Sequence, residues 1–267
     1  MKIAVVQMGA GRDKEQNVAK ALRLTGEAVA RGARLVALPE VFNYRGALKS
    51  ASDRRRVAEG IPGESSAPFM RLAKKEKVCI LLGSLLEAIK NSDKVFNTSV
   101  FIDTKGEISG KYRKINLFDA VMGKMSVRES DVFKAGARMA IVPAKNFRIG
   151  LTICYDLRFP LLYQQYAGKA VDIICAPSAF TEKTGRAHWE TLVRARAIET
   201  LSYVLAPNQV GRDGRGILSY GNSLIVGPWG DILARGSLSK EEILFARINE
   251  KEIKRARAIL PSICSKR

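Results

Sequence analysis

The 267-residue chain has little histidine, and its four cysteines are widely spaced. His188 is the only histidine, which excludes metal sites built from several histidines, including the H-E-x-x-H zinc helix. The cysteines stand at positions 79, 154, 175 and 264 without a C-x-x-C pair. We therefore expect neither a disulfide framework nor a structural zinc site, and a reducing, cytoplasmic setting.

The chain also lacks a long hydrophobic run. Its longest nearly uninterrupted apolar stretch covers residues 78–86, whereas a membrane-spanning helix needs about 20 residues. The opening sequence MKIAVVQM carries one lysine and no A-x-A-like cleavage site nearby, so it indicates a first strand rather than a signal peptide. The sequence therefore predicts a protein that does not span a membrane.

Negative charge is the third shortage. Lysine and arginine number 45 and aspartate and glutamate 26, which gives a formal net charge of +19. Such a charge favours polyanions, either nucleic acid or an anionic membrane surface. The basic residues are spread along the chain, however, and no zinc-finger spacing, RNA-recognition signature or basic heptad run occurs. We interpret the charge as a generally cationic surface, without a specific nucleic-acid or membrane partner.

Hydrophobic residues make up 46% of the chain, which is enough to form a hydrophobic core. Short apolar runs alternate with amphipathic stretches, and this order predicts a layered α/β fold in one domain, residues 1–267. One helix is expected to open at Asp13 and to end at Gly32, and residues 119–146 are expected to be loop. The other expected helices cover 65–77, 160–168, 185–201 and 251–258, and the expected strands cover 3–8, 34–38, 78–87, 94–103, 108–114, 147–153, 171–176, 203–206, 223–226 and 243–248.

Cys154 stands out once the common catalytic signatures are found missing. The chain has no P-loop, no dinucleotide fingerprint and no G-x-S-x-G elbow. Cys154 follows the apolar strand sequence IGLTI and precedes a turn and a helix, and ligands bind at the carboxyl ends of strands in α/β sheets. A nearby helix N-terminus would lower the thiol pKa and favour thiolate. The alternative is a small buried cysteine, which we expect for Cys79 and Cys175.

Two charged residues end other predicted strands. Glu40 lies in ALPEVF, where apolar neighbours would raise its pKa and suit it to acid–base catalysis. Lys114 lies in GKYRKINLFD, and its ammonium group near a thiol would stabilise thiolate and the oxyanion of a tetrahedral intermediate. The alternatives are a solvated carboxylate beyond a strand and a surface lysine.

The segments ALPEVF (37–42), GKYRKINLFD (110–119) and GLTICYDLRFP (150–160) resemble, in this order, the Glu, Lys and Cys motifs of the nitrilase, or carbon–nitrogen hydrolase, superfamily. Residues 178–200 and 220–234 also match, so the resemblance covers nearly the whole chain and points to the Nit-type branch. It implies a four-layer α-β-β-α sandwich, a homodimer or higher homo-oligomer, and no metal or other cofactor.

The resemblance also implies roles for individual residues. Cys154 would be the nucleophile, Glu40 the general base and Lys114 the group that stabilises the oxyanion. Glu129, in VRESDVF, matches the family's second glutamate, which positions the lysine or the substrate. The backbone N–H of Tyr155 would complete the oxyanion hole.

Other residues bear on which substrate is accepted. His188, in AHWE, is expected either to bind substrate through a hydrogen bond or to serve at a helix start. Arg158, in LRFP, is expected either to form a buried ion pair or to shape the site. Asn116 stands where members of the branch often have histidine, and residues 119–126 lack the usual Pro-Gly pattern. Both departures are expected near the pocket entrance.

The implied activity is hydrolysis of a non-peptide carboxamide C–N bond in a small, anionic amide. The reaction would pass through a cysteine thioester and release ammonia and a carboxylic acid. Two alternatives remain open. One is an N-carbamoyl or nitrile hydrolase of the same superfamily, and the other is a non-catalytic basic protein that contacts polyanions.

Overall fold

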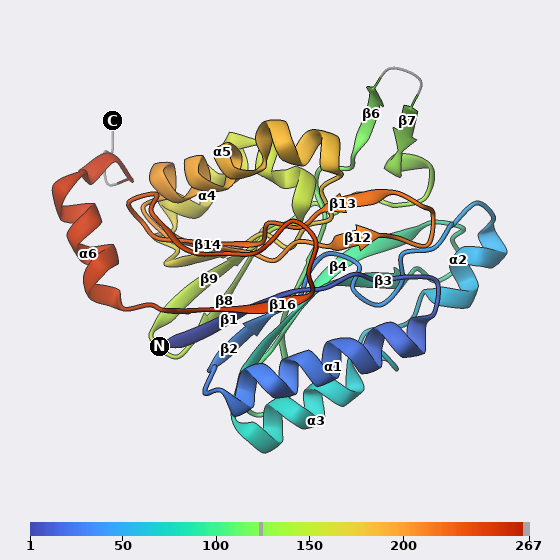
Figure 1. The fold of residues 1–267 in the computed structure, drawn as a ribbon, viewed down its shortest axis with the longest axis horizontal. Coiled ribbons are helices and arrows are strands. Elements are labelled where there is room, and N and C mark those ends of the chain that lie inside the picture. The colour runs from blue at the N-terminus through green and yellow to red at the C-terminus, as the bar shows by residue number, and fades with distance from the viewer. Residues whose placement is uncertain (123–124, 264–267) are drawn as a thin grey trace.

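Two six-stranded sheets form the centre of the computed structural model, which describes residues 1–122 and 125–263 (Figure 1). The first sheet has the strand order β16-β1-β2-β3-β4-β5, and the second has the order β15-β14-β11-β10-β9-β8. The strands of the first sheet are β1 (Lys2–Gln7), β2 (Leu35–Ala37), β3 (Cys79–Ala88), β4 (Val95–Ile102), β5 (Ile108–Arg113) and β16 (Glu242–Arg247). Those of the second are β8 (Ala140–Ala144), β9 (Phe147–Leu151), β10 (Ile173–Cys175), β11 (Tyr203–Ala206), β14 (Leu224–Val226) and β15 (Ile232–Arg235).

Helices cover the outer face of each sheet. α1 (Lys14–Ala30) and α3 (Ala67–Glu76) lie on the first sheet, and α4 (Pro160–Gly168) and α5 (Glu182–Thr200) lie on the second (Figure 1). The layer order is therefore α-β-β-α, as expected. Helices α2 (Ala51–Val57) and α6 (Glu250–Ile259) lie at opposite ends of the molecule. The remaining elements are the ribbons β6 (Asp119–Met122) with β7 (Met125–Arg128) and β12 (Val210–Arg212) with β13 (Leu218–Tyr220), and the 3-10 turns η1 (Glu129–Asp131), η2 (Cys154–Arg158) and η3 (Pro261–Ile263).

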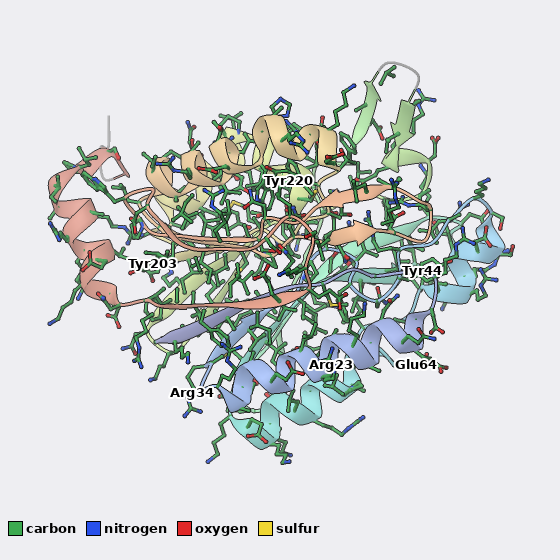
Figure 2. All side chains as sticks on the ribbon, viewed as in Figure 1. Arg23, Arg34, Tyr44, Glu64, Tyr203 and Tyr220 are labelled. Carbon is green, nitrogen blue, oxygen red and sulfur yellow. The ribbon has the colours of Figure 1, made fainter. Side chains whose placement is uncertain are left out.

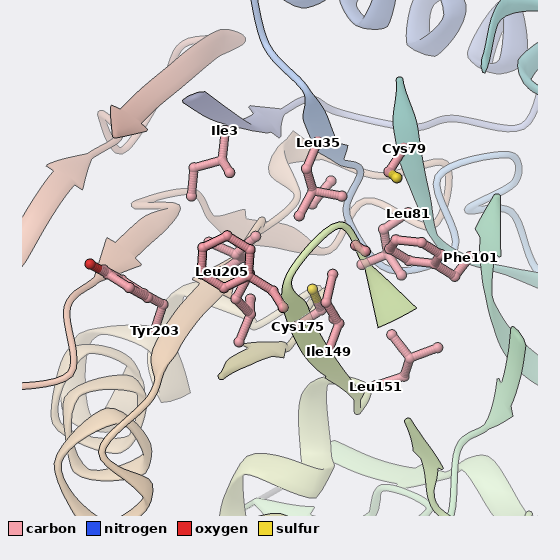
Figure 3. Packing of buried hydrophobic residues seen from close by; sticks show 14 of the residues in the cluster. Ile3, Leu35, Cys79, Leu81, Phe101, Ile149, Leu151, Cys175, Tyr203 and Leu205 are labelled. Atoms are coloured by element: carbon pink, nitrogen blue, oxygen red, sulfur yellow. The ribbon is translucent and has the colours of Figure 1, made fainter. Parts of the chain in front are cut away.

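The largest core lies between the two sheets. Leu35 and Leu81 from the first sheet meet Ile149 and Leu205 from the second, and all four side chains are fully buried (Figure 3). Side chains alternate along each strand, so the opposite faces pack against the helices in two further clusters. Each sheet is thus buried on both faces, which explains why its central strands are nearly continuous apolar runs.

The predicted helix start at Asp13 is confirmed, because its side chain accepts a hydrogen bond from the N–H of Gln16 at 3.0 Å. The prediction of loop over 119–146 is wrong in part. That segment contains β6, β7, η1 and the edge strand β8, which pairs with β9 in antiparallel register. Since β8 includes Pro143 and alternates little in hydrophobicity, its strand conformation depends on the pairing with β9 rather than on local sequence pattern. The sequence pattern did not predict four further elements, which are α2, β12, β13 and β15.

The sheet topology brings distant motifs to one edge. β1, β2 and β3 are parallel to one another, and β4 is antiparallel to both of its neighbours, β3 and β5. β5 therefore runs in the same direction as β2, and both strands end at the same edge of the first sheet. Glu40 follows β2 and Lys114 follows β5. In the second sheet, Cys154 follows β9, which is parallel to β10.

None of the helices described in residues 1–122 and 125–263 is long and apolar enough to cross a membrane.

Gly83 in β3 lies close to the backbone of the segment that leads to Glu40. A Cβ at this position would lie 2.0 Å from the carbonyl oxygen of Leu38 and 2.2 Å from that of Pro39. We predict that Gly83→Ala lowers the free energy of unfolding by about 2–3 kcal/mol, because backbone must move to accept the methyl group. Urea denaturation measures the change.

The matched control is Gly26→Ala in α1, where an added Cβ meets nothing within 4 Å. This variant is expected to gain roughly 0.5–1 kcal/mol from the higher helix propensity of alanine. Equal stabilities of the two variants would contradict the crowding at Gly83.

Candidate active site

Lys114 is the centre of a buried charge cluster. Its Nζ lies 2.9 Å from Oε1 of Glu40 and 2.9 Å from Oε2 of Glu129. Lys114 is 1% exposed and Glu40 3% exposed, so these charges interact with little screening by water. Glu129 is held from the other side, because its Oε2 accepts a hydrogen bond from the N–H of Phe118 at 2.8 Å. One ammonium group is thus shared by two carboxylates.

Glu40 is held by its neighbours on both its side chain and its backbone. Its Oε1 accepts a hydrogen bond from Nδ2 of Asn97, and its carbonyl oxygen accepts one from Nε2 of Gln209, each at 2.9 Å. The next residue, Val41, has φ = +46°, an uncommon conformation for a β-branched residue, and donates its N–H to Oγ of Ser84 at 2.8 Å. Strain of this kind persists only where the surroundings hold it, and it is common at functional sites.

Cys154 occupies a similarly constrained turn between β9 and η2. Its φ is +46°, and its N–H donates to the carbonyl oxygen of Pro177 at 2.9 Å. The turn is tied together by Asp156, whose Oδ2 accepts from the N–H of Ile153 at 2.9 Å and from the hydroxyl of Tyr112 at 2.7 Å. The sharp turn places the thiol of Cys154 at the end of the strand, and Tyr155 follows at the start of η2, where backbone N–H groups have no partner within the helix.

The three predicted catalytic side chains share one pocket. A cavity of about 380 Å³ is lined by Glu40, Lys114 and Cys154, together with Glu129. The carboxylate of Glu40 acts to raise the pKa of the Cys154 thiol, and the backbone N–H of Ala179 acts to lower it. Residues 74 and 40 positions apart in the chain are therefore in mutual reach, as the strand-end placement predicted.

The charge state of the pocket differs from the expectation. Burial raises the pKa of the Cys154 thiol, and the negative charge of Glu40 raises it further, against the opposing effect of Lys114. Burial also acts to raise the pKa of Glu40, but the charges of Lys114 and Arg45 and the hydrogen bonds from Lys114 and Cys154 outweigh it and hold that pKa below its usual value. The expected raised pKa of Glu40 is therefore wrong, because the neighbours are cations rather than apolar groups alone.

Lys114 stays protonated. Burial acts to lower its pKa, but Glu129 and Glu40 together raise it well above the ordinary value. The resting pocket thus holds a neutral thiol, an ionised carboxylate and an ammonium group. The expected thiolate is not favoured, because the ammonium charge is already shared by two carboxylates and one of these faces the sulfur.

Asn116 and Asp156 form a support behind the site. The backbone N–H and Nδ2 of Asn116 both donate to Oδ1 of Asp156, at 3.0 and 2.8 Å. Asn116 is not among the residues that line the pocket, although Lys114 and Phe118, two residues away on either side, are. Within the 119–126 segment, Ser126 does line the pocket, while residues 123–124 lie outside the described part of the chain.

His188 and Arg158 contact each other rather than the pocket. Nη1 of Arg158 lies 3.3 Å from Nδ1 of His188, and the guanidinium group lies 5.7 and 5.4 Å from the ring centroids of Tyr155 and Phe180. His188 is exposed at the surface of α5. Neither residue lines the cavity that holds Cys154, so their substrate-binding role stays a prediction.

Sequence reasoning missed three residues of this site. Asn97 and Gln209 hold Glu40, and Arg45 lines the pocket and affects the charge of Glu40. Asn97 lies within β4, and no sequence motif marks it. Arg45 lies five residues after Glu40, but the chain has many arginines and the sequence alone does not distinguish this one.

Among the residues that the structure describes, no group of three or more His, Cys, Asp or Glu side chains is placed to hold a metal ion. Cys264 lies outside the described residues.

The chain also matches known proteins. Residues 2–258 match the family described as carbon-nitrogen hydrolase. The NitFhit nitrilase and fragile histidine triad fusion protein of Drosophila melanogaster is 38% identical over 252 residues, which cover 92% of this chain and 53% of that protein. Omega-amidase NIT2 of Homo sapiens is 34% identical over 267 residues, which cover 100% of this chain and 95% of that protein. The crystal structure of the C. elegans NitFhit protein superposes with a TM-score of 0.92 at 35% identity, covering 100% of this chain and 65% of that one.

The chain belongs to the carbon–nitrogen hydrolase family, and it is an enzyme that hydrolyses amide carbon–nitrogen bonds. Within the family it lies close to the Nit-type branch, as its motifs indicated. It spans about half the length of the Drosophila fusion protein and nearly all of the human omega-amidase.

The charge cluster predicts a pH-dependent stability. We expect Lys114→Met to lower the free energy of unfolding at pH 7 by about 3–5 kcal/mol, because it leaves two carboxylates without their cation. The folded-state pKa of Glu40 is lowered, so its stabilising contacts are present above the unfolded pKa of about 4.3 and are lost as the pH falls through the folded pKa. In the variant, burial raises the pKa of Glu40 without opposition from Lys114.

The difference between the wild type and Lys114→Met is therefore greatest near neutral pH and shrinks in acid. Urea denaturation at pH 7 and at about pH 4 measures it, because these values lie on either side of the unfolded pKa. Lys49→Met, at an exposed lysine, is the control and should stay within about 0.5 kcal/mol of the wild type at both values. A difference that is constant or grows in acid would contradict the assigned charge states.

Proposed function

We propose that this enzyme hydrolyses a small anionic carboxamide through a thioester on Cys154, with release of ammonia and a carboxylic acid. Glu40 is the general base, Lys114 stabilises the oxyanion and Glu129 positions Lys114. The observation that carries this proposal is the single pocket that the Cys154 thiol shares with Glu40, whose buried carboxylate lies 2.9 Å from the ammonium group of Lys114.

In the first half of the reaction, Glu40 takes the proton of the Cys154 thiol as the sulfur forms a bond to the amide carbon. The carbonyl oxygen becomes an oxyanion, which faces the Lys114 ammonium group and the N–H of Tyr155. Protonated Glu40 then gives its proton to the leaving nitrogen. The carbon–nitrogen bond breaks, ammonia leaves and a thioester remains.

In the second half, water replaces ammonia beside Glu40. The carboxylate takes a proton from water as the oxygen attacks the thioester carbon. The resulting oxyanion collapses, the carbon–sulfur bond breaks and the proton returns to Cys154. Glu40 acts in both halves because Lys114 and Arg45 keep it ionised at rest.

The roles of Cys154 and Glu40 are tested by substitution. Cys154→Ala is expected to reduce ammonia release by at least about a thousandfold, because the nucleophile is lost. Glu40→Gln removes the base with little change in volume and is expected to have a loss of similar size. Ammonia released from a panel of amides is the measurement.

Cys79→Ala is the matched control. This thiol lies in the core between the sheets, and burial raises its pKa to about 11, so its removal should leave the reaction intact (Figure 3). Wild-type activity in Cys154→Ala would end the proposed mechanism, and loss of activity in Cys79→Ala alone would point to another thiol.

The substrate class is supported by the charge of the pocket wall. Arg45, Arg128 and Arg215 all line the cavity beside the catalytic side chains. The panel therefore includes ω-amides of 2-oxo acids and deaminated glutathione, as well as carbamoyl amino acids and simple nitriles. Hydrolysis confined to the last two classes would favour the alternative carbamoyl or nitrile hydrolase.

We also propose that the enzyme forms a homodimer or a higher homo-oligomer. A groove beside α6 is lined by the exposed apolar side chains of Trp229, Leu233 and Ile259. Tyr203, which lines this groove, and Tyr44, which lines the catalytic pocket, lie at opposite ends of the molecule (Figure 2). A second copy seated on the groove would bury this apolar surface and leave the pocket open.

Trp229→Glu tests the assembly. Trp229 is 54% exposed, and a charge at its position is expected to shift the mass measured by light scattering towards the monomer. Leu161→Glu, at a leucine that is 70% exposed on α4, is the control and should keep the wild-type mass. A monomeric wild type, or an unchanged mass in Trp229→Glu, would contradict an interface at this groove.

Three further properties belong to the same proposal. The chain forms one carbon–nitrogen hydrolase domain over residues 1–267, since the main core joins both sheets. The setting is cytoplasmic, consistent with the free thiols of Cys79, Cys154 and Cys175. The dispersed positive charge serves to attract small anions rather than a specific nucleic acid.

A further inference from the structure

Asp156 is a buried carboxylate to which the mechanism above gives no part. Its side chain is fully buried, and it is not among the residues that line the cavity of Cys154. Oδ2 accepts hydrogen bonds from the N–H of Ile153 at 2.9 Å and from the hydroxyl of Tyr112 at 2.7 Å. Oδ1 accepts two from Asn116, from its backbone N–H at 3.0 Å and from Nδ2 at 2.8 Å. Neutral donors thus fill the acceptor sites of both carboxylate oxygens.

These donors come from the two segments that carry Lys114 and Cys154. One donor is the residue immediately before Cys154, and Asp156 itself stands two residues after it. The others, Tyr112 and Asn116, stand two residues before and two residues after Lys114. One carboxylate therefore joins the chain on either side of the ammonium group to the turn that presents the sulfur.

The two segments belong to different sheets. The backbone N–H of Lys114 donates to the carbonyl oxygen of Asn97 in β4 at 2.9 Å, which fixes Lys114 to the first sheet. The N–H of Cys154 donates to the carbonyl oxygen of Pro177, which follows β10 of the second sheet. The core between the sheets consists of apolar contacts, which have no preferred direction. Hydrogen bonds are directional, so the bonds of Asp156 define where one segment stands relative to the other.

Glu40 has a comparable link of its own. It follows β2 of the first sheet, and its carbonyl oxygen accepts from Nε2 of Gln209, which follows β11 of the second sheet. Gln209 is buried as well. The carboxylate and the ammonium group of the pocket are therefore each joined to the other sheet by a buried polar side chain.

We propose that Asp156 is a positioning residue, which sets the place of the Lys114 ammonium group relative to the Cys154 sulfur through its hydrogen bonds from Tyr112 and Asn116. The oxyanion forms between these two groups in both halves of the reaction, so their separation affects each half. This inference rests on the proposed function.

Tyr112→Phe tests the link. It removes one hydroxyl and leaves the aromatic ring in the core between the sheets. We expect kcat for the fastest amide of the panel to fall by at least about tenfold, because a displacement of about 1 Å in a catalytic group costs about a hundredfold. KM is expected to stay within about threefold of the wild-type value, since neither Tyr112 nor Asp156 lines the pocket.

Tyr163→Phe is the matched control, because both tyrosines are fully buried. The hydroxyl of Tyr163 lies 3.1 Å from Oγ1 of Thr152, so this variant also loses one buried hydrogen bond near the Cys154 turn. That bond joins α4 to the residue after β9 and does not reach Lys114. Its kcat should stay within about twofold of the wild type, because the position of the ammonium group is unchanged. An equal fall of kcat in both variants would show a general effect of lost hydrogen bonds and would overturn the proposal.

Alkylation of Cys154 by iodoacetamide gives a readout that does not depend on amide hydrolysis. The charge of Lys114 acts to lower the pKa of this thiol, and the thiolate is the form that reacts. An ammonium group that moves away from the sulfur lets the thiol pKa rise, and a rise of one slows alkylation about tenfold at a fixed pH. Peptide mass spectrometry is expected to show alkylation of Cys154 that is at least about threefold slower in Tyr112→Phe than in Tyr163→Phe. Equal rates in the two variants would overturn the proposal.

Asp156→Asn tests the carboxylate itself. The amide keeps the volume but presents a donor where the neighbours also donate, so kcat is expected to fall by about a hundredfold. Adding Tyr112→Phe to this variant should change kcat by less than about threefold, because the hydroxyl has already lost its carboxylate. Losses that multiply would show two independent effects and would overturn the link. If Asp156→Asn does not fold, Tyr112→Phe and its control decide the question.

Failure of the link and failure of the proposed function are distinguishable. A wild-type enzyme that releases no ammonia from any amide of the panel would overturn the proposed function, and slower alkylation of Cys154 in Tyr112→Phe would still support the link. Wild-type kcat in Tyr112→Phe would overturn the link and leave the amidase standing.

Discussion

The structure of the active site depends on one buried ammonium group held between two carboxylates. Lys114 keeps Glu40 ionised in a place where burial alone would protonate it, and Glu129 keeps Lys114 protonated. Because the ammonium charge is shared, it does not draw the proton off Cys154, whose pKa is raised. The pocket therefore rests as thiol and carboxylate, which is the state that the proposed role of Glu40 as general base requires.

The fold supports this cluster through strained turns at strand ends. Val41 and Cys154 both have φ = +46°, and each donates its backbone N–H to an acceptor on another segment of the fold, Ser84 and Pro177 respectively. Close backbone packing of Gly83 against the Pro39 carbonyl fixes the path of the segment before Glu40. Strain and close packing are tolerated here because two sheets and their covering helices over-determine the backbone.

Local sequence pattern predicted the buried elements better than the surface ones. The boundaries of α4 and β11 fall on the expected residues, since both are framed by clear signals and packed on the second sheet. The segment 119–146 was misjudged, because β8 is an edge strand whose conformation depends on β9 and the β6–β7 ribbon carries no alternating pattern. Isolated edge pairing is a tertiary effect that a reading along the chain does not contain.

The amino-acid sequence by itself determined the layer architecture, the family and the three side chains at the strand ends, because apolar periodicity and the motifs around Glu40, Lys114 and Cys154 are local properties. Only the tertiary structure decided the charge states in the pocket and the pairing of Arg45 with Asp213, which lie 168 positions apart in the chain. A pKa depends on burial and on charges across space, and neither quantity is defined until distant segments have packed together.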